Sequence, residues 1–133
     1  MTNKALVYFA LSGNDFEPDE VTRLIGVEPT SIRRKGVPTP VFSFWQFGSE
    51  EVVSDIVDIY EMSSALVFRL QAYEAKIANT KKLLKLDAVL QVVLWITADE
   101  SKSTPAIGFE PEVITFLSNI GASVDIDTYR NVP

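Results

Sequence analysis

Two runs of apolar residues predict buried strands. Residues 5–11 (ALVYFAL) carry apolar side chains on both faces of a period-two ribbon, and residues 88–98 (AVLQVVLWITA) are equally apolar and rich in β-branched residues. A strand that is apolar on both faces is typical of the middle of a sheet. The pattern therefore predicts that these two strands lie side by side at the centre of one sheet.

The segment Phe-Glu-Pro occurs twice and predicts the start of a helix each time. Proline fits the first helical position because the N–H that it lacks has no partner there. In the first copy Glu17 is the expected cap, Pro18 starts the helix, and Gly26 ends it in the left-handed conformation. In the second copy the helix starts at Pro111 and ends at Gly121. The two helices are short and have one buried face each.

A longer helix is expected from Ile59, because apolar residues then recur every three or four positions. Asp58 and Glu61 have the spacing of a capping box at its start. The helix is expected to bend near Ala72 or to break at residues 79–80.

Other segments carry weaker patterns. The alternation in residues 41–47 predicts an aromatic-rich strand, and residues 122–130 predict a half-exposed strand. Residues 106–109 are a short strand candidate. Three prolines in residues 28–40 indicate a long connection with little regular structure, and residues 48–57 show no clear pattern.

The order β-α-β-α(α)-β-β-α-β predicts the α+β class and a single domain over residues 1–133. Two-layer packing buries helices that are apolar on one side, so we expect a two-layer sandwich. Its sheet is expected to be antiparallel or mixed, to have about five strands, and to carry the helices on one face. A ferredoxin-like or related arrangement is the nearest named architecture.

The net charge of −6 disfavours nucleic acid as the partner, because phosphate binding requires a basic face. It suits a basic protein partner instead. No apolar run approaches the roughly 20 residues of a membrane span, and the first residues read as a strand rather than a signal peptide. The expected location is the cytoplasm.

Histidine and cysteine are absent, which excludes Cys-His and Ser-His-Asp catalysis, the usual zinc sites and thiol redox chemistry. No catalytic residue, metal site or cofactor is predicted. An enzyme could use only carboxylates, tyrosines, lysines and hydroxyls, so an enzymatic role is less expected than a binding role.

Asp125, Asp127 and Tyr129 alternate along one predicted strand and share a face. The two aspartates could flank a substrate or hold a hard cation. The alternative is that they keep an exposed strand face solvated and discourage edge pairing.

Arg33, Arg34 and Lys35 beside Gly36 could receive a phosphate or carboxylate, although a solvated loop is the simpler interpretation. Trp45 is expected in the core. If it were exposed, it would be an anchor for a partner, because binding energy concentrates on aromatic residues and arginines.

Three stretches together resemble the bacterial domain-of-unknown-function family 4279 over nearly the whole chain. They are GNDFEPDEVT with GVEPT after it (residues 13–22 and 26–30), RKG followed by Trp45, and TPAI with IGASVDIDTY (residues 104–107 and 120–129). The family has no established activity or catalytic residues, so the resemblance implies a fold and a bacterial origin. Members usually carry an aromatic residue, typically Trp, at the position of Arg33. If that residue packs against the sheet in them, this loop is held differently here.

Two functions remain open from the sequence. The first is a non-enzymatic binding or regulatory protein that neutralises a basic protein partner in the manner of bacterial immunity proteins. The second is a small-ligand or anion-binding protein, or a carboxylate-dependent hydrolase. That protein would use Asp125, Asp127 and Tyr129 together with Arg34 and Lys35.

Overall fold

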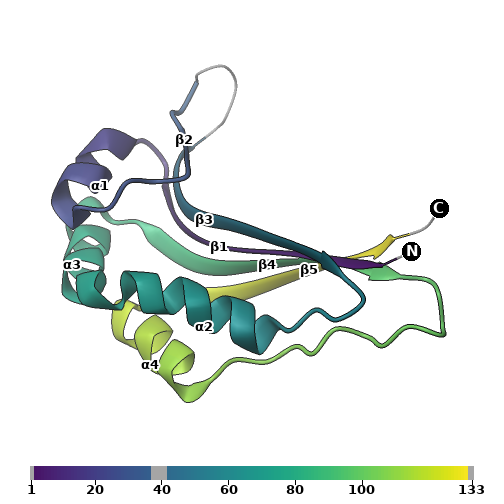
Figure 1. Ribbon diagram of the computed structural model, residues 1–133. Coiled ribbons are helices and arrows are strands. Elements are labelled where there is room, and N and C mark those ends of the chain that lie inside the picture. Colours follow the sequence, from purple (N-terminus) through teal and green to yellow (C-terminus); the bar gives the residue numbers. More distant parts are fainter. Residues whose placement is uncertain (1, 37–41, 132–133) are drawn as a thin grey trace.

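The computed structural model describes residues 2–36 and 42–131, without the side chains of residues 49 and 50. Five strands form one sheet in the order β2-β3-β1-β4-β5, and the helices lie together on one side of it (Figure 1). The predicted two-layer α+β fold is confirmed. The strands are β1 (Asn3–Gly13), β2 (Ser31–Arg33), β3 (Ser43–Ser54), β4 (Asp87–Thr97) and β5 (Ser123–Asn131). The helices are α1 (Pro18–Ile25), α2 (Ile59–Leu70), α3 (Glu74–Leu84) and α4 (Pro111–Ile120), and the 3₁₀ turn η1 (Gln71–Tyr73) joins α2 to α3.

The two apolar strands are neighbours, as predicted. β1 lies at the centre of the sheet and pairs antiparallel with β3 on one side and β4 on the other. β5 pairs parallel with β4, so the sheet is mixed. In a split β-α-β unit another strand lies between the two parallel strands, but here β4 and β5 are adjacent. The arrangement is therefore related to the split ferredoxin-like one without being identical to it.

The core fills the space between the sheet and the helices. Alternate residues of β1, such as Val7, Phe9 and Leu11, point towards the helices and are essentially fully buried. Phe9 meets Phe116 of α4 edge-on, with 6.4 Å between ring centroids. Each such side chain contributes about 1.5–3 kcal/mol by leaving water, so this layer of side chains holds the helices on one side.

The helix ends follow the local sequence closely. α1 and α4 begin at their prolines, and Gly26 and Gly121 end them with φ angles of 85° and 71°. Asp58 caps α2 by accepting a hydrogen bond from the backbone N–H of Tyr60. Of the two positions considered for an interruption, the chain uses the one near Ala72, where η1 lies, and α3 continues through residues 79–80.

Three expectations about the connections were wrong. Residues 28–40 were expected to be irregular, but Ser31–Arg33 pair with β3 as the edge strand β2. β3 does not stop at residue 47 and continues to Ser54. Its pairing with β1 changes register between Val7 and Phe9 of β1. Residues 106–109 form no strand, since only one bridge joins Ala106 to Asp58.

β5 is more exposed than the half-exposed strand that was expected. Every residue from 123 to 130 is exposed, and the strand lies at the edge of the sheet. Among the described residues, no helix is both long and apolar enough to span a membrane.

Candidate functional site

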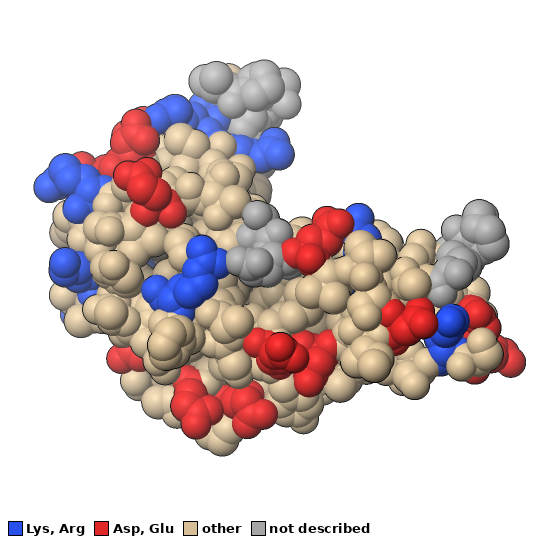
Figure 2. Space-filling model, in the orientation of Figure 1, with Lys and Arg blue, Asp and Glu red and all other residues tan. Residues whose placement is uncertain are grey.

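The side of the sheet opposite the helices is here called the open face (Figure 1). No helix within the described residues covers it. Strand alternation and the pairing registers assign its residues, because paired residues point to the same face. Its central and β5-side members are Lys4, Leu6, Tyr8, Ala10, Val89, Gln91, Val93, Trp95, Asp125, Asp127 and Tyr129. The molecule is hollowed along this side (Figure 2).

Asp125 and Asp127 lie on the open face beside Gln91 of β4. Gln91 is 8% exposed, and its side-chain amide donates to Oδ2 of Asp127 at 3.2 Å and to the carbonyl oxygen of Asp125 at 3.3 Å. Gln91 therefore connects β4 to both aspartates and fixes the position of the Asp127 carboxylate.

Tyr8 lies directly opposite Gln91 in the pairing of β1 with β4. Burial raises its pKa above the ordinary value of 10.0, and the negative charges of Asp127 and Asp125 raise that pKa further. The hydroxyl therefore stays protonated and neutral at physiological pH. Tyr8 and Gln91 complete a polar cluster with the two aspartates, and this cluster can offer carboxylate oxygens to a cationic group.

An aromatic pair continues the open face towards the ends of β4 and β5. Trp95 and Tyr129 stack with 5.9 Å between ring centroids, and the Lys4 ammonium lies 4.6 Å from the Trp95 centroid. The same ammonium is 3.7 Å from a carboxylate oxygen of Glu51. Tyr129 itself is 53% exposed. Trp95 thus already contacts one cation of the chain, as an electron-rich aromatic face can.

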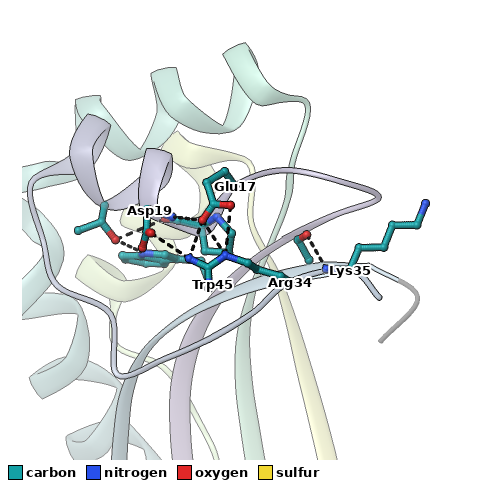
Figure 3. Close-up of polar contacts among 8 residues, drawn as sticks. Glu17, Asp19, Arg34, Lys35 and Trp45 are labelled. Atoms are coloured by element: carbon teal, nitrogen blue, oxygen red, sulfur yellow. Dashed lines mark hydrogen bonds and ion pairs between the residues drawn. The ribbon is translucent and has the colours of Figure 1, made fainter. Parts of the chain in front are cut away.

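Arg34 is occupied by carboxylates of α1. It donates from Nε to Oε1 of Glu17 at 2.9 Å and from its terminal nitrogen to Oδ2 of Asp19 at 2.9 Å (Figure 3). The hydrogen bond from Arg34 holds the pKa of Glu17 below its ordinary value of 4.5. An external phosphate would have to displace these two carboxylates. Arg34, one of the three basic residues of the candidate anion site, is thus neutralised by its own chain.

The neighbours of Arg34 point elsewhere. Arg33 pairs with Phe44 of β3 and is exposed, and the side chain of Lys35 extends away from the Glu17–Arg34 pair (Figure 3). The backbone N–H of Lys35 donates to the hydroxyl of Ser43 at 3.1 Å, which fixes the loop backbone.

The basic loop and the aspartates are not brought together. The basic loop continues from the end of β2, whereas the aspartates belong to β5. These two strands are opposite edges of the sheet, with three strands between them. At ~4.8 Å per strand, the path across the sheet is about 19 Å. The composite site of Asp125, Asp127 and Tyr129 with Arg34 and Lys35 is therefore not assembled.

Trp45 has no exposed surface and cannot contact a partner. It points into the core beside Phe47, and its indole N–H donates to the hydroxyl of Thr22 at 3.1 Å (Figure 3). The expectation that it belongs to the core is confirmed, and its candidate role as a binding residue is corrected. The exposed aromatic side chain on this sheet that does fit that role is Tyr129.

Sequence reasoning missed Tyr8 and Gln91 as parts of the site. Gln91 is the one amide in the run AVLQVVLWITA, and an unexplained polar residue in a buried strand was a usable signal. Tyr8 carried no such signal, because a tyrosine in an apolar strand is ordinary. Only the pairing of β1, β4 and β5 brings it to the aspartates.

A separate hollow of about 420 Å³ lies between the end of β3 and α2. Its lining is mainly apolar and includes Val52, Ile56 and Met62, together with the α2 cap Asp58. It is on the helix side of the sheet and shares no residue with the open face.

A family model described as a domain of unknown function (DUF4279) matches residues 2–131. The chain belongs to the DUF4279 family. Comparisons with curated proteins and with solved structures found no match. The description of the family names no activity.

Proposed function

We propose that this DUF4279 protein is a non-enzymatic binding domain that captures or regulates a basic protein partner on its open face, as an immunity protein does. The observation that carries the proposal is the one-sided helix layer, which leaves the opposite side of a five-stranded sheet uncovered. A sheet face of this kind that carries aromatic and charged side chains suits a protein partner.

The charge of the open face supports a basic partner. Among the described side chains that alternation and register assign to it, the carboxylates of Glu51, Asp87, Asp125 and Asp127 face only two cations, Lys4 and Arg33. Lys4 is already paired with Glu51. Complementary charge accelerates encounter and fixes the orientation of the partner, so lysine and arginine side chains are the expected contacts.

The aromatic pair supplies the apolar part of such a contact. Tyr129 presents about half of its surface to solvent and rests on Trp95, so its ring is already oriented. A pre-oriented aromatic side chain loses little entropy on binding and is a common energetic centre of an interface.

The alternative, an anion-binding protein or carboxylate-dependent hydrolase, requires the basic loop to work with the aspartates. Arg34 is instead held by Glu17 and Asp19 at the far edge of the sheet. The polar cluster at the β5 side of the open face offers a neutral tyrosine, an amide and two carboxylates. That set suits a cationic partner better than an anion.

Co-purification with a pair of matched variants tests the proposal. The untagged protein is isolated from its native cell beside Asp125→Asn/Asp127→Asn and beside Glu61→Gln/Glu112→Gln. Both variants lose two exposed negative charges. The second pair lies on the helices α2 and α4 rather than on the open face. We expect the wild type and the helix variant to retain a basic partner, and the Asp125/Asp127 variant to lose it by about tenfold or more. Recovery as a lone monomer, or equal loss in both variants, would count against the proposal.

A further inference from the structure

β5 is a long strand at the edge of the sheet. It spans Ser123–Asn131 and, among the described strands, pairs only with β4. In a parallel pair, alternate residues of the edge strand direct their N–H and C=O groups outwards. The outer edge of β5 thus presents a row of backbone donors and acceptors that a further strand can bind.

Both faces of β5 are also exposed. Asp125 and Asp127 lie on the open face, and Val124 and Ile126 lie on the helix side with 40% of their surface accessible to solvent. Residues 123–131 contain no proline or glycine that would interrupt pairing. Residues 124–127 therefore alternate apolar and acidic side chains, and neither set is covered.

A second copy of the chain fits this edge poorly. The antiparallel self-pairing that uses all nine residues is centred on Asp127, and it sets the two Asp127 carboxylates directly opposite each other. Like charges at directly opposed positions destabilise a strand pair. A partner segment that places a cation opposite Asp127 is instead attracted by this carboxylate.

We propose that β5 binds an extended segment of the partner as a sixth strand, with lysine or arginine opposite Asp125 and Asp127 and apolar side chains opposite Val124 and Ile126. The inference deepens the proposed function, because it names how the basic partner docks. Backbone hydrogen bonds along the outer edge supply affinity, and the alternating side chains supply specificity.

Amide hydrogen exchange with a synthetic peptide tests the docking mode. The probe is a nine-residue peptide that alternates lysine and valine, and its control alternates glutamate and valine. In the free protein we expect slow and fast amides to alternate along residues 123–131, because every second N–H points outwards. The lysine peptide slows exchange of the fast set by about tenfold or more, and the glutamate peptide does not.

Backbone methylation separates strand addition from simple charge attraction. Two further lysine peptides carry N-methyl groups on odd or on even residues. Strand addition predicts that one of them binds about tenfold or more weakly and that the other binds like the parent, because only one set of N–H groups faces β5. Equal affinities for all three peptides would overturn the inference.

Charge reversal gives a second readout. The Asp125→Lys/Asp127→Lys variant, checked for folding by circular dichroism, should prefer the glutamate peptide over the lysine peptide. A variant that keeps the lysine preference would place the contact away from β5. A β5-mediated dimer found by sedimentation would also overturn the inference.

The two proposals fail in different ways. If the native partner is lost with Asp125→Asn/Asp127→Asn but no β5 amide is protected, the open face binds the partner without strand addition. If neither the partner nor the lysine peptide binds, both proposals are wrong.

Discussion

Tyr8 reports directly on the cluster at the centre of the open face. Burial is the largest cause of its raised pKa, followed by the charges of Asp127 and Asp125. In Asp125→Asn/Asp127→Asn we expect the pKa to fall towards 10.0 but to remain above it, because burial persists. Titration of the Tyr8 ring by NMR measures this. An unchanged pKa would mean that the carboxylates do not act on Tyr8.

Tyr8 also makes the free energy of unfolding decrease at alkaline pH. A pKa raised in the folded state means that the folded protein holds the proton more tightly than the unfolded chain. The contribution of Tyr8 is therefore complete below pH 10.0, the ordinary pKa, and is lost as the pH rises through the folded pKa. In Tyr8→Phe this part of the decrease in the free energy of unfolding at alkaline pH is absent.

At the residue scale, sequence reasoning succeeded where one strand or helix carried the information. The shared face of Asp125, Asp127 and Tyr129 follows from alternation alone. The burial of Trp45 was expected because this residue lies in an aromatic-rich strand. The pairing of Arg34 with Glu17 and Asp19 joins residues 15 and 17 positions apart. No local pattern encodes a contact that depends on how a loop folds back over a helix.

At the element scale, Lys85 ends α3 in the left-handed conformation without being a glycine, with a φ angle of 55°. An L-residue in this region is strained, and glycine is not. We expect Lys85→Gly to increase the free energy of unfolding by about 1 kcal/mol, measured by urea denaturation, because relief of strain exceeds the entropy that glycine adds to the unfolded chain.

The matched control is Lys76→Gly, an exposed substitution inside the same helix, where glycine is unfavourable by about 1 kcal/mol. If both substitutions destabilise the protein equally, the cap conformation of Lys85 is not the one described.

Element ends were predictable because caps are local, whereas strand extent was not. Pro18, Pro111 and Asp58 mark the helix starts through chemistry that lies within four residues. β3 continues past Gly48, whose φ angle of 87° interrupts the alternation that identifies a strand. β2 has only three residues, and it exists because β3 is there to pair with it.

At the scale of the whole molecule, the order of strands decides which residues meet. The sequence predicted that β1 and β4 would be central neighbours, since both are apolar on each face. It could not predict that β2 and β5 would become opposite edges, because edge position depends on the pairing of all five strands. That order separates the basic loop from the aspartates and leaves one edge of β5 free of described strands.

The helix side of the molecule is the main competitor of the open face for a partner. Phe68 of α2 is 80% exposed and Ile114 of α4 is 57% exposed, and carboxylates are spread over this side too (Figure 2). Negative charge therefore does not separate the two sides. The stacked Trp95–Tyr129 pair, in which about half of the Tyr129 surface is exposed, is what favours the open face.

The most direct test compares one exposed aromatic residue from each side. Calorimetric titration of the co-purified partner into Tyr129→Ala and Phe68→Ala measures both losses of affinity. We expect Tyr129→Ala to weaken binding by about 30-fold, or about 2 kcal/mol, and Phe68→Ala by less than about twofold. A larger loss for Phe68→Ala would place the partner on the helices and contradict the account.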